Sequence, residues 1–593
     1  MNEILVLALV LLQICAQFAT SGSPVHRLPG FEGPLPFHLE TGYVGVGDSE
    51  KGGQVFYYFI ESENNPQEDP LMLWLTGGPG CSSFSGLIFE IGPIAFKVEK
   101  YNGTLPKLVR RPQAWTKACS IIFVDLPIGS GFSYANTPYL QRGDWTLVNH
   151  AHQFIRKWLI DHPRFLSHQV YIGGDSYSGI PVPAMVQKIS NGNEKGIQPW
   201  INLQGYVLGN PLTTMEEENY LPSFAHGMAL ISDELYMSLK KNCKGNYINI
   251  DPENKSCLRD FNILHELISG LSEYDTLNPK CEMALNTPHG FFSRRSLINK
   301  FRTTLISSRL ARPPLSCQSY VYFLGYDWIQ DNKVQEALHI RKGSKRNWQR
   351  CNPFDYSYDI TSAFPYHANL SPKGFRSLIY NGDHDPIVPF MSTQAWIRDL
   401  NYSIVEDWRP WLVNGQVAGY TRRYSNKMTF ATVKGAGHIT PEYKPEESFA
   451  MFIRWISNTP LWPTGARIKD VLWKVFHLSL EGKAKEWYMN LPLYVDNPYE
   501  SWTTLRRAFL DKYFPSTKIS TARKEISAAK QEERKTFFQF WSQFHDMLTK
   551  CSNHQIIEEH LVHYFYNGLF PHDAKVLDAT ANGSVELMKP QAA

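Results

Sequence analysis

Short apolar runs recur along the chain, and each one leads into a loop rich in glycine. They occupy residues 71–75, 121–124, 170–172, 377–380 and 428–433. Runs of this length without polar alternation are typical of strands buried on both faces. Helical stretches separate several of them. The pattern therefore predicts an α/β fold with a mostly parallel sheet.

One of these loops presents a candidate nucleophile. Ser176 lies in the stretch Gly173-Gly174-Asp175-Ser176-Tyr177-Ser178-Gly179, directly after the run at 170–172. A sharp turn from strand to helix, flanked by small residues, exposes a serine at its tip. Taken alone, this motif is also compatible with an ordinary buried serine in a glycine-rich turn. The partners of Ser176 elsewhere in the chain decide between the two readings.

Later loops supply a base and an acid for this serine. His438 ends the stretch Lys434-Gly435-Ala436-Gly437-His438, and Asp383 and Asp385 follow the run at 377–380. Serine attack needs a base, a carboxylate that orients the base, and donors for the oxyanion. The chain order Ser, Asp, His is that of α/β-hydrolases. Spacing alone leaves Asp383 and Asp385 as alternatives for the orienting acid.

Two changes in composition and hydrophobic pattern divide the rest of the chain. Residues 213–350 combine polar helices with four cysteines, which predicts a cap region inserted over the carboxyl edge of the sheet. After the Pro/Gly break at 460–465 the pattern is helical throughout, with apolar stripes such as Phe537, Trp541, Phe544 and Leu548. We therefore expect one large domain over 23–462 and a small all-α domain over 466–593.

The amino-terminal residues read as a secretory signal. An apolar run from Ile4 to Leu12 is too short to span a bilayer and is followed by small residues. The segment before the run holds Glu3 and no Lys or Arg, which departs from the usual pattern. We place the signal peptide at 1–22. Later stretches lack the length and apolarity of a membrane helix, so no membrane association is expected after its removal.

Composition and cysteine usage narrow the function classes. The 593 residues carry a net charge of +3 and 19% charged residues, so no nucleic-acid partner is expected. The nine cysteines form no CxxC pair and no Cys/His ligand spacing, so we expect no metal site and instead disulfides behind a signal peptide. Passage through the secretory pathway also fits five Asn-x-Ser/Thr sites, at Asn102, Asn254, Asn369, Asn401 and Asn582.

Residues from about 30 to 461 resemble plant serine carboxypeptidase-like proteins, a family with the α/β-hydrolase fold. The stretches that carry the resemblance are 74–83 (Trp-Leu-Thr-Gly-Gly-Pro-Gly-Cys-Ser-Ser), 174–179, 382–385 and 437–438. The resemblance implies that Ser176 is the nucleophile, His438 the base and Asp385 the orienting acid, with Asp383 a structural loop residue. It implies no cofactor.

The same resemblance implies roles for further residues. The backbone N–H groups of Gly78 and Tyr177 would form the oxyanion hole. Three disulfides are implied, with Cys119 unpaired and buried. The implied disulfides are Cys81–Cys351, Cys243–Cys257 and Cys281–Cys317.

Two positions bear on which acceptor receives the acyl group. Carboxypeptidases of this family resemble one another in an Asn before the Gly-Gly-Pro-Gly stretch and a Glu before the nucleophile. Here these positions hold Thr76 and Asp175, which weakens a network for binding a substrate carboxylate. Glu90 is a candidate remnant of that network. By resemblance, substrate contact is expected at Thr76, Gly77, Glu90 and Asp175.

This combination resembles the plant branch that transfers acyl groups from glucose esters to alcohol or amine acceptors. We therefore predict acyl transfer between a small-molecule donor and acceptor. The alternative is a carboxypeptidase or esterase acting on peptide substrates, and a second alternative is a catalytically idle binding or fusion product. The family implies a secreted or vacuolar location. The basic stretch 294–312 is either a processing site, as in some relatives, or an uncut loop.

The tail from about 466 to 570 resembles the gag region of plant retrotransposons. The carrying stretches are 478–487, Trp502 with Phe509, 513–514 and 566–569. No Cys/His zinc knuckle follows, so the resemblance implies at most a helical module for self-association. A capsid-like piece behind a secretion signal suggests a transposon insertion or a joined gene model. We expect it to contribute nothing to catalysis.

Overall fold

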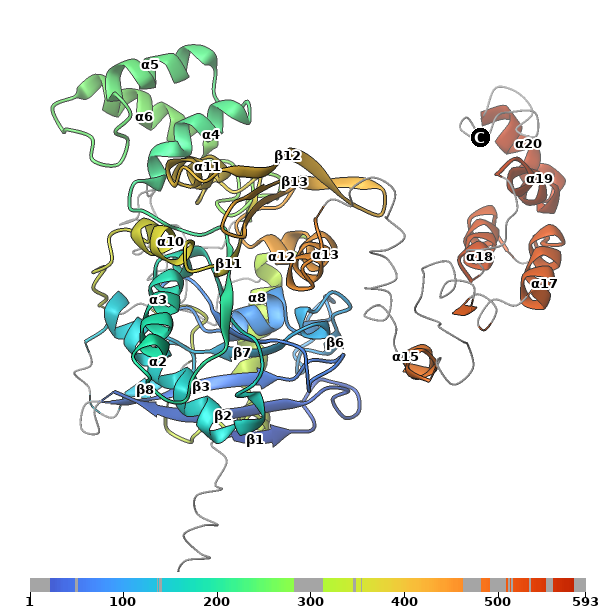
Figure 1. Ribbon diagram of the computed structural model, residues 1–593. Coiled ribbons are helices and arrows are strands. Elements are labelled where there is room, and N and C mark those ends of the chain that lie inside the picture. The colour runs from blue at the N-terminus through green and yellow to red at the C-terminus, as the bar shows by residue number, and fades with distance from the viewer. Residues whose placement is uncertain are drawn as a thin grey trace, which may run out of the picture. The chain divides into compact units, whose positions relative to one another are not determined.

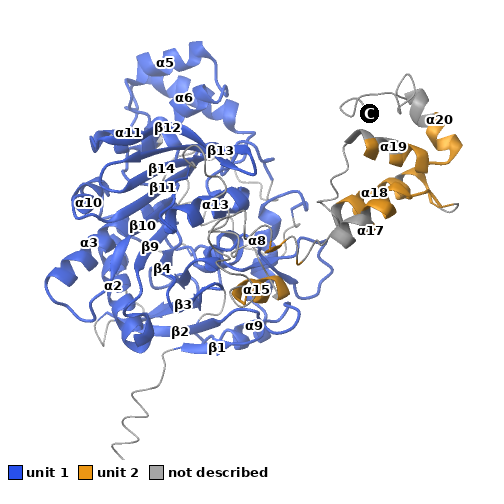
Figure 2. Cartoon of the chain, turned by 45° about the vertical axis from the view of Figure 1, so that its right-hand side comes forward, with its two compact units in different colours: residues 1–462 blue, residues 463–593 orange. Residues whose placement is uncertain are grey.

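The computed structural model describes most of the chain in two compact units, residues 1–462 and 463–593, which we treat separately (Figure 2). Three predicted features lie outside the described residues: the signal peptide up to residue 21, the basic stretch 294–312 and Asn582. Gly22, the last residue of the predicted signal peptide, is described. The described residues are 22–47, 52–135, 137, 141–281, 313–344, 348–352, 355–461, 482–490, 508–509, 512, 516–532, 535–550 and 558–580.

A twelve-stranded mixed sheet forms the centre of the first unit (Figure 1). Its middle strands, from β7 to β14, run parallel, and antiparallel strands complete both edges. In spatial order the strands are β1 (Gly22–Val25), β2 (Leu39–Val46), β3 (Gly53–Ile60), β7 (Ser120–Val124), β4 (Leu71–Leu75), β9 (Val170–Asp175), β10 (Leu203–Gly209), β11 (Arg376–Gly382), β14 (Met428–Val433), β13 (Gln416–Tyr424) and β12 (Ile404–Val413), with β8 (Tyr134–Ala135) beside β3. A separate two-stranded sheet pairs β5 (Ile94–Phe96) with β6 (Leu108–Arg110).

The predicted parallel strands are confirmed. All five apolar runs form strands of the central sheet, and β4, β7, β9 and β14 are buried along their whole length. Strand β10 and the β12–β13 hairpin were not predicted from the sequence. The hairpin lies at one edge of the sheet and mixes exposed, half-buried and buried residues, so it does not make a continuous apolar run.

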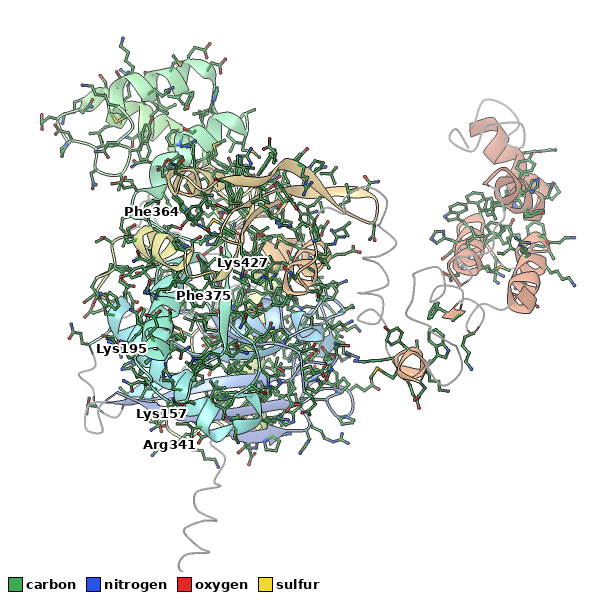
Figure 3. All side chains as sticks on the ribbon, in the orientation of Figure 1. Lys157, Lys195, Arg341, Phe364, Phe375 and Lys427 are labelled. Carbon is green, nitrogen blue, oxygen red and sulfur yellow. A yellow bond between two sulfur atoms is a disulfide. The ribbon has the colours of Figure 1, made fainter. Side chains whose placement is uncertain are left out.

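Helices cover both faces of the sheet (Figures 1 and 2). On one face, the core joins the strands to α2 (Asp144–Asp161), α3 (Pro181–Glu194), α10 (Phe364–Leu370) and α11 (Phe390–Asp399). Phe364 and Phe375, both labelled in Figure 3, pack against this core. On the other face lie α8 (Ser319–Ile329), α12 (Thr440–Tyr443) and α13 (Pro445–Ile456).

Neighbouring residues of β9 pack on opposite faces of the sheet. Ile172 belongs to the core shared with α2 and α3, while Tyr171 packs on Trp455 of α13 with ring centroids 5.4 Å apart. Successive side chains of a strand point to opposite sides, so a strand covered on both faces must be apolar throughout. This explains the continuous apolar runs.

The inserted region has two parts with different packing. Helices α4 (Leu221–Gly227), α5 (Asp233–Cys243) and α6 (Lys255–Ile268) form their own small core and stand away from the sheet (Figure 1). Helix α8 instead packs into the body of the first unit, where Trp328 stacks on Phe84 with centroids 5.7 Å apart. Helix α9 (Asn332–Ala337) follows it. Within the expected cap region over 213–350, α4, α5 and α6 thus share a core of their own, while α8 packs into the body of the unit.

Short helical turns complete the first unit. They are η1 (Gly86–Glu90), η2 (Trp115–Lys117), η3 (Pro163–Phe165), η4 (Ser176–Gly179) and η5 (Glu217–Tyr220).

The described part of the second unit is helical. Ile526, Phe540, Phe544 and Phe565 form its core. The helices are α15 (Gly482–Met489), α17 (Ser516–Ser527), α18 (Phe537–Lys550), α19 (Glu558–Gly568) and α20 (Pro571–Thr580).

Candidate active site

Ser176 lies at the tip of the turn between β9 and α3. Its backbone has a φ of 55°, a left-handed conformation that non-glycine residues rarely adopt. Gly77 lies so close that a Cβ there would be 2.7 Å from the Cβ of Ser176. A Cβ on Gly174 would likewise be 2.6 Å from the carbonyl oxygen of Leu75. Glycine at these two positions makes room for the strained turn.

Ser176, His438 and Asp385 form a continuous hydrogen-bonded chain. Nε2 of His438 lies 2.7 Å from Oγ of Ser176, and Nδ1 of His438 lies 2.8 Å from Oδ2 of Asp385. The three residues follow β9, β14 and β11, whose carboxyl ends share one edge of the sheet. His438 and Asp385 are buried. This is the geometry that lets a histidine take the proton of a serine hydroxyl.

The structure separates the two aspartates that spacing left as alternatives. Asp385 also accepts hydrogen bonds from the backbone N–H groups of Ile387 and Val388, at 2.8 and 3.2 Å. Asp383 accepts a bond from the N–H of Gly435 at 2.7 Å, so it joins the loops after β11 and β14. Asp385 therefore contacts the histidine, and Asp383 supports the loops.

Asn210 completes the surroundings of Asp385 and was not singled out from the sequence. Its Nδ2 donates to Oδ2 of Asp385 at 2.8 Å, and its Oδ1 accepts from Oγ1 of Thr440 at 2.7 Å. Asn210 directly follows β10, which lies between β9 and β11. The signal that would have found it is its position after Leu203–Gly209, since the carboxyl ends of parallel strands gather at one edge.

The loop that carries Gly78 runs beside the turn that carries Tyr177, the two residues whose N–H groups are expected to form the oxyanion hole. A Cβ on Gly77 would lie 2.9 Å from the backbone nitrogen of Tyr177, so the two loops run side by side next to Ser176. Gly78 has a φ of 120°, which favours glycine. The hydroxyl of Tyr177 donates to Oδ1 of Asp144 at 2.6 Å, which fixes the orientation of this residue.

The pKa values of His438 and Asp175 are both displaced from their usual values. Burial opposes protonation of His438, but the charge and hydrogen bond of Asp385, with the charge of Asp175, raise the pKa of His438 above 6.5. Burial raises the pKa of Asp175 to about 6, against the lowering effect of His438. A base with a raised pKa holds its proton more tightly once it has taken it.

Of the four positions expected to contact substrate, Asp175 interacts with two others, Gly77 and Glu90. Oδ1 of Asp175 accepts from the N–H of Gly77 at 3.3 Å. Burial and the charge of Asp175 raise the pKa of Glu90 well above its usual range. Oγ1 of Thr76 and Oε2 of Glu90 are buried and have no hydrogen-bond partner among the described residues.

Two arginines that were not predicted from the sequence place positive charge near these carboxyl groups. Arg111 donates to the carbonyl oxygens of Ile88, Phe89 and Glu90, so it holds the end of η1. The guanidinium of Arg350 lies 4.2 Å from the ring centroid of Tyr322. A positive charge near buried carboxyl groups lowers their pKa values, as Arg350 does for both Glu90 and Asp175.

The structure contains the three disulfides that the resemblance implied. Cys81–Cys351 anchors the loop after Gly80, Cys243–Cys257 joins α5 to α6, and Cys281–Cys317 joins two segments of the inserted region. Cys119 is a buried free thiol, and burial raises its pKa well above the usual range.

Three of the described glycosylation sequons expose their asparagine, at Asn102, Asn369 and Asn401. Asn254 differs because it is half-buried and its side chain is engaged. It accepts from the N–H of Cys257 at 3.1 Å and donates to the carbonyl oxygen of Asn242 at 2.8 Å. Among the described residues no cluster of His, Cys, Asp and Glu has the arrangement of a metal site. No helix in the described part of the chain has the length and apolarity to cross a membrane.

Comparison with known proteins identifies the family. The family model for serine carboxypeptidases (Peptidase S10) matches residues 29–458. This chain belongs to the serine carboxypeptidase family. It is therefore an enzyme of the serine hydrolase type. The match ends before the second unit begins at residue 463.

Plant relatives match almost over their whole length. Serine carboxypeptidase-like 12 of Arabidopsis thaliana is 52% identical over 460 residues, which cover 77% of this chain and 99% of that protein. Serine carboxypeptidase-like 11 of the same plant is 51% identical over 464 residues, covering 78% of this chain and all of that protein.

A solved structure shows the same fold. The crystal structure of Kex1(delta)p, a prohormone-processing carboxypeptidase from Saccharomyces cerevisiae, matches with a TM-score of 0.58 at 19% identity. The match covers 73% of this chain and 95% of that one.

Proposed function

We propose that this member of the serine carboxypeptidase family is an acyltransferase, which moves an acyl group from a glucose ester to an alcohol or amine acceptor. The observation that carries the proposal is the pair Thr76 and Asp175. The carboxypeptidases of the family resemble one another in Asn and Glu at these positions. A threonine cannot offer an amide donor, and Asp175 already accepts from the N–H of Gly77 at 3.3 Å.

The first half of the reaction forms an acyl-enzyme. Nε2 of His438 takes the proton of Ser176 Oγ as this oxygen attacks the ester carbonyl carbon. The N–H groups of Gly78 and Tyr177 would receive the negative oxygen of the tetrahedral intermediate. When the carbon–oxygen bond to glucose breaks, His438 returns the proton to the departing sugar hydroxyl.

The second half transfers the acyl group. An acceptor hydroxyl or amine enters where glucose left, and His438 takes its proton as it attacks the acyl carbon. The bond to Ser176 breaks, and the serine regains its proton from His438. Asp385 stays ionised and stabilises the imidazolium that forms in each half. Water in place of the acceptor would give hydrolysis.

A carboxypeptidase is the second candidate, and Glu90 favours it. Its carboxyl is buried, and its raised pKa favours the protonated form, which can donate a hydrogen bond to a carboxylate. A peptide substrate would present such a carboxylate at its end. This candidate uses the same acyl-enzyme and differs in the group that resolves it.

The deciding experiment incubates the purified protein with an acyl-glucose and an acceptor, and separately with a blocked dipeptide. We expect acyl transfer and little release of amino acid. The Ser176→Ala variant should lose about 10⁴-fold or more of the turnover. Ser178→Ala is the matched control, since the hydroxyl of Ser178 donates to the carbonyl oxygen of Leu75 at 2.9 Å. Peptide hydrolysis without acyl transfer would establish the second candidate.

A double variant tests the observation that carries the proposal. Thr76→Asn with Asp175→Glu restores the pair of residues that the carboxypeptidases share. We expect it to raise the ratio of peptide hydrolysis to acyl transfer. An unchanged ratio would remove Thr76 and Asp175 as determinants of the reaction.

We further propose that the protein enters the secretory pathway, with glycans at the exposed sequons and a secreted or vacuolar destination. The signal peptide is assigned to 1–22. Cleavage after residue 22 would remove Gly22, which pairs with Gly42 as the first residue of β1, and would leave residues 23–25 of that strand in the mature protein. Sequencing the amino terminus of the mature protein tests this assignment.

For the second unit we propose a gag-like origin, with self-association as its only expected activity. The support is the sequence resemblance and the position of residues 463–593 beyond the matched residues 29–458. Sequencing full-length transcripts across residues 455–475 tests whether the two units are translated together.

A further inference from the structure

Two segments of the inserted region contact the loops that carry Asp385 and His438. The first covers residues 273–281, after α6, and the second covers residues 317–322, at the start of α8. The disulfide Cys281–Cys317 joins the two segments, with Cα atoms 5.8 Å apart. We call the two segments with their disulfide the brace.

The first segment holds the backbone of both catalytic loops. The N–H of His438 itself donates to the carbonyl oxygen of Tyr274 at 2.6 Å. Two residues along the brace, the N–H of Thr276 donates to the carbonyl oxygen of His384 at 3.2 Å. His384 directly precedes Asp385. The first segment of the brace is therefore hydrogen-bonded to His438 itself and to the residue before Asp385.

The fit between this segment and the histidine loop is close. A Cβ on Gly437 would lie 2.2 Å from the carbonyl oxygen of Tyr274 and 2.4 Å from the Cβ of Asp275. Asp275 is buried and accepts from the N–H of Leu277 at 3.0 Å, which stiffens the segment. A displacement of the brace would therefore reach His438 directly.

The second segment contacts α12, the short helix that follows the loop of His438. Glu442 lies in α12, four residues after His438. One of its carboxylate oxygens accepts from the hydroxyl of Tyr322 at 2.8 Å, and the other accepts from the side chain of Gln318. Gln318 follows Cys317, so the disulfide joins the segment bonded to His438 itself to the segment bonded to Glu442, four residues further along.

We propose that the brace positions His438 for proton transfer, with Cys281–Cys317, Tyr322 and Glu442 as positioning groups. The inference rests on the proposed role of His438 as the base. Proton transfer requires the imidazole within hydrogen-bond reach of Ser176, and a misplacement of about 1 Å can cost about 100-fold in rate. The brace bonds the backbone of His438 directly and holds the side chain of Glu442 four residues later.

The test compares two disulfides in the full-length protein. Cys281→Ser with Cys317→Ser opens the brace. Cys243→Ser with Cys257→Ser is the matched control, because that disulfide lies within the separate core of α4, α5 and α6. The readouts are kcat and KM for acyl-glucose, the rate at which a fluorophosphonate modifies Ser176 as a function of pH, and the midpoint of thermal unfolding.

We expect the open brace to lower kcat and the rate of Ser176 modification about tenfold or more, with KM changed less than about twofold. The control pair should leave both rates near wild type. Equal rates in the two disulfide variants would overturn the proposal. A raised KM with an unchanged kcat in the open-brace variant would overturn it as well.

A single substitution covers the case in which the open brace fails to fold. Tyr322→Phe removes one hydrogen bond to Glu442 and keeps the ring beneath Arg350. We expect a few-fold lower kcat at an unchanged unfolding midpoint, and an unchanged kcat would contradict the proposal. Ser176→Ala separates the two levels: if that variant stays active, the proposed function itself is wrong, whatever the brace variants do.

Discussion

Asn210 and His438 share one oxygen of Asp385. Nδ2 of Asn210 and Nδ1 of His438 each lie 2.8 Å from its Oδ2. Asn210 is also bonded to Thr440, two residues beyond the histidine, at 2.7 Å. The asparagine therefore fixes the carboxylate and the histidine loop together, and it does so from the end of β10, a strand that leads into none of Ser176, Asp385 and His438.

Removing the amide of Asn210 should lower the rate. Asn210→Gly suits the left-handed φ of 45° and deletes the donor to Asp385. A hydrogen bond to a charged group is worth about 1.5–3 kcal/mol, so we expect kcat to fall about 10-fold or more. Steady-state acyl transfer measures it. Asn426→Gly is the control, since Asn426 has a φ of 61° on an exposed turn. Equal kcat values in the two variants would contradict the assigned role.

The pH dependence should report the pKa of His438. The histidine acts as a base only when neutral, so kcat/KM should fall as the pH drops through its pKa, above 6.5. Asp175 contributes to that raised pKa through its negative charge. Asp175→Asn should therefore move the acid limb of the kcat/KM profile to lower pH. A limb that stays in place or moves upward would show that Asp175 does not act on the histidine.

Asp175 should also weaken the fold at neutral pH. Burial raises the pKa of its carboxyl to about 6 in the folded protein, from an ordinary value of 3.8. The unfolded chain then releases this proton first, so stability falls as the pH rises from about 4 to about 6. Asp175→Asn lacks this cost. We expect its free energy of unfolding to exceed that of the wild type at pH 7 and the gap to narrow by pH 4, as measured by denaturant titration.

Gly77 should tolerate no side chain. A Cβ there would lie 2.7 Å from the Cβ of Ser176, 2.8 Å from the carbonyl oxygen of Asp175 and 2.9 Å from the nitrogen of Tyr177. Gly77→Ala must displace the nucleophile turn, so we expect activity to fall about 100-fold. Gly270→Ala is the control, because nothing lies within 4 Å of a Cβ there. Titration of Ser176 with a fluorophosphonate would follow both, and full reactivity in Gly77→Ala would refute the close approach.

Deleting the second unit should leave catalysis intact. The first unit contains the sheet, all residues of the candidate site and the three disulfides. A chain ending at residue 461 should keep the kcat and the unfolding midpoint of the full-length protein. Size-exclusion chromatography of both forms tests self-association. A loss of activity on truncation would assign the tail a role in the enzyme.

The sequence by itself determined the central strands and the chain order of Ser176, Asp385 and His438. Strands buried on both faces must be apolar throughout, so β4, β9 and β14 are visible in the pattern. A nucleophile on a tight turn needs small neighbours, and these are visible as glycines. Both signals are local, because each depends on residues close together in the chain.

Only the tertiary structure decided which groups meet. Asp383 and Asp385 are two residues apart in one loop, and their different partners depend on the loop after β14, about 50 residues later. The contacts of Asn210 and of the brace could not be predicted from the sequence either, since each is bonded to residues more than 100 positions away. Hydrogen bonds between distant segments leave no periodic trace in a sequence, because nothing but the packing of the sheet brings their partners within about 3 Å.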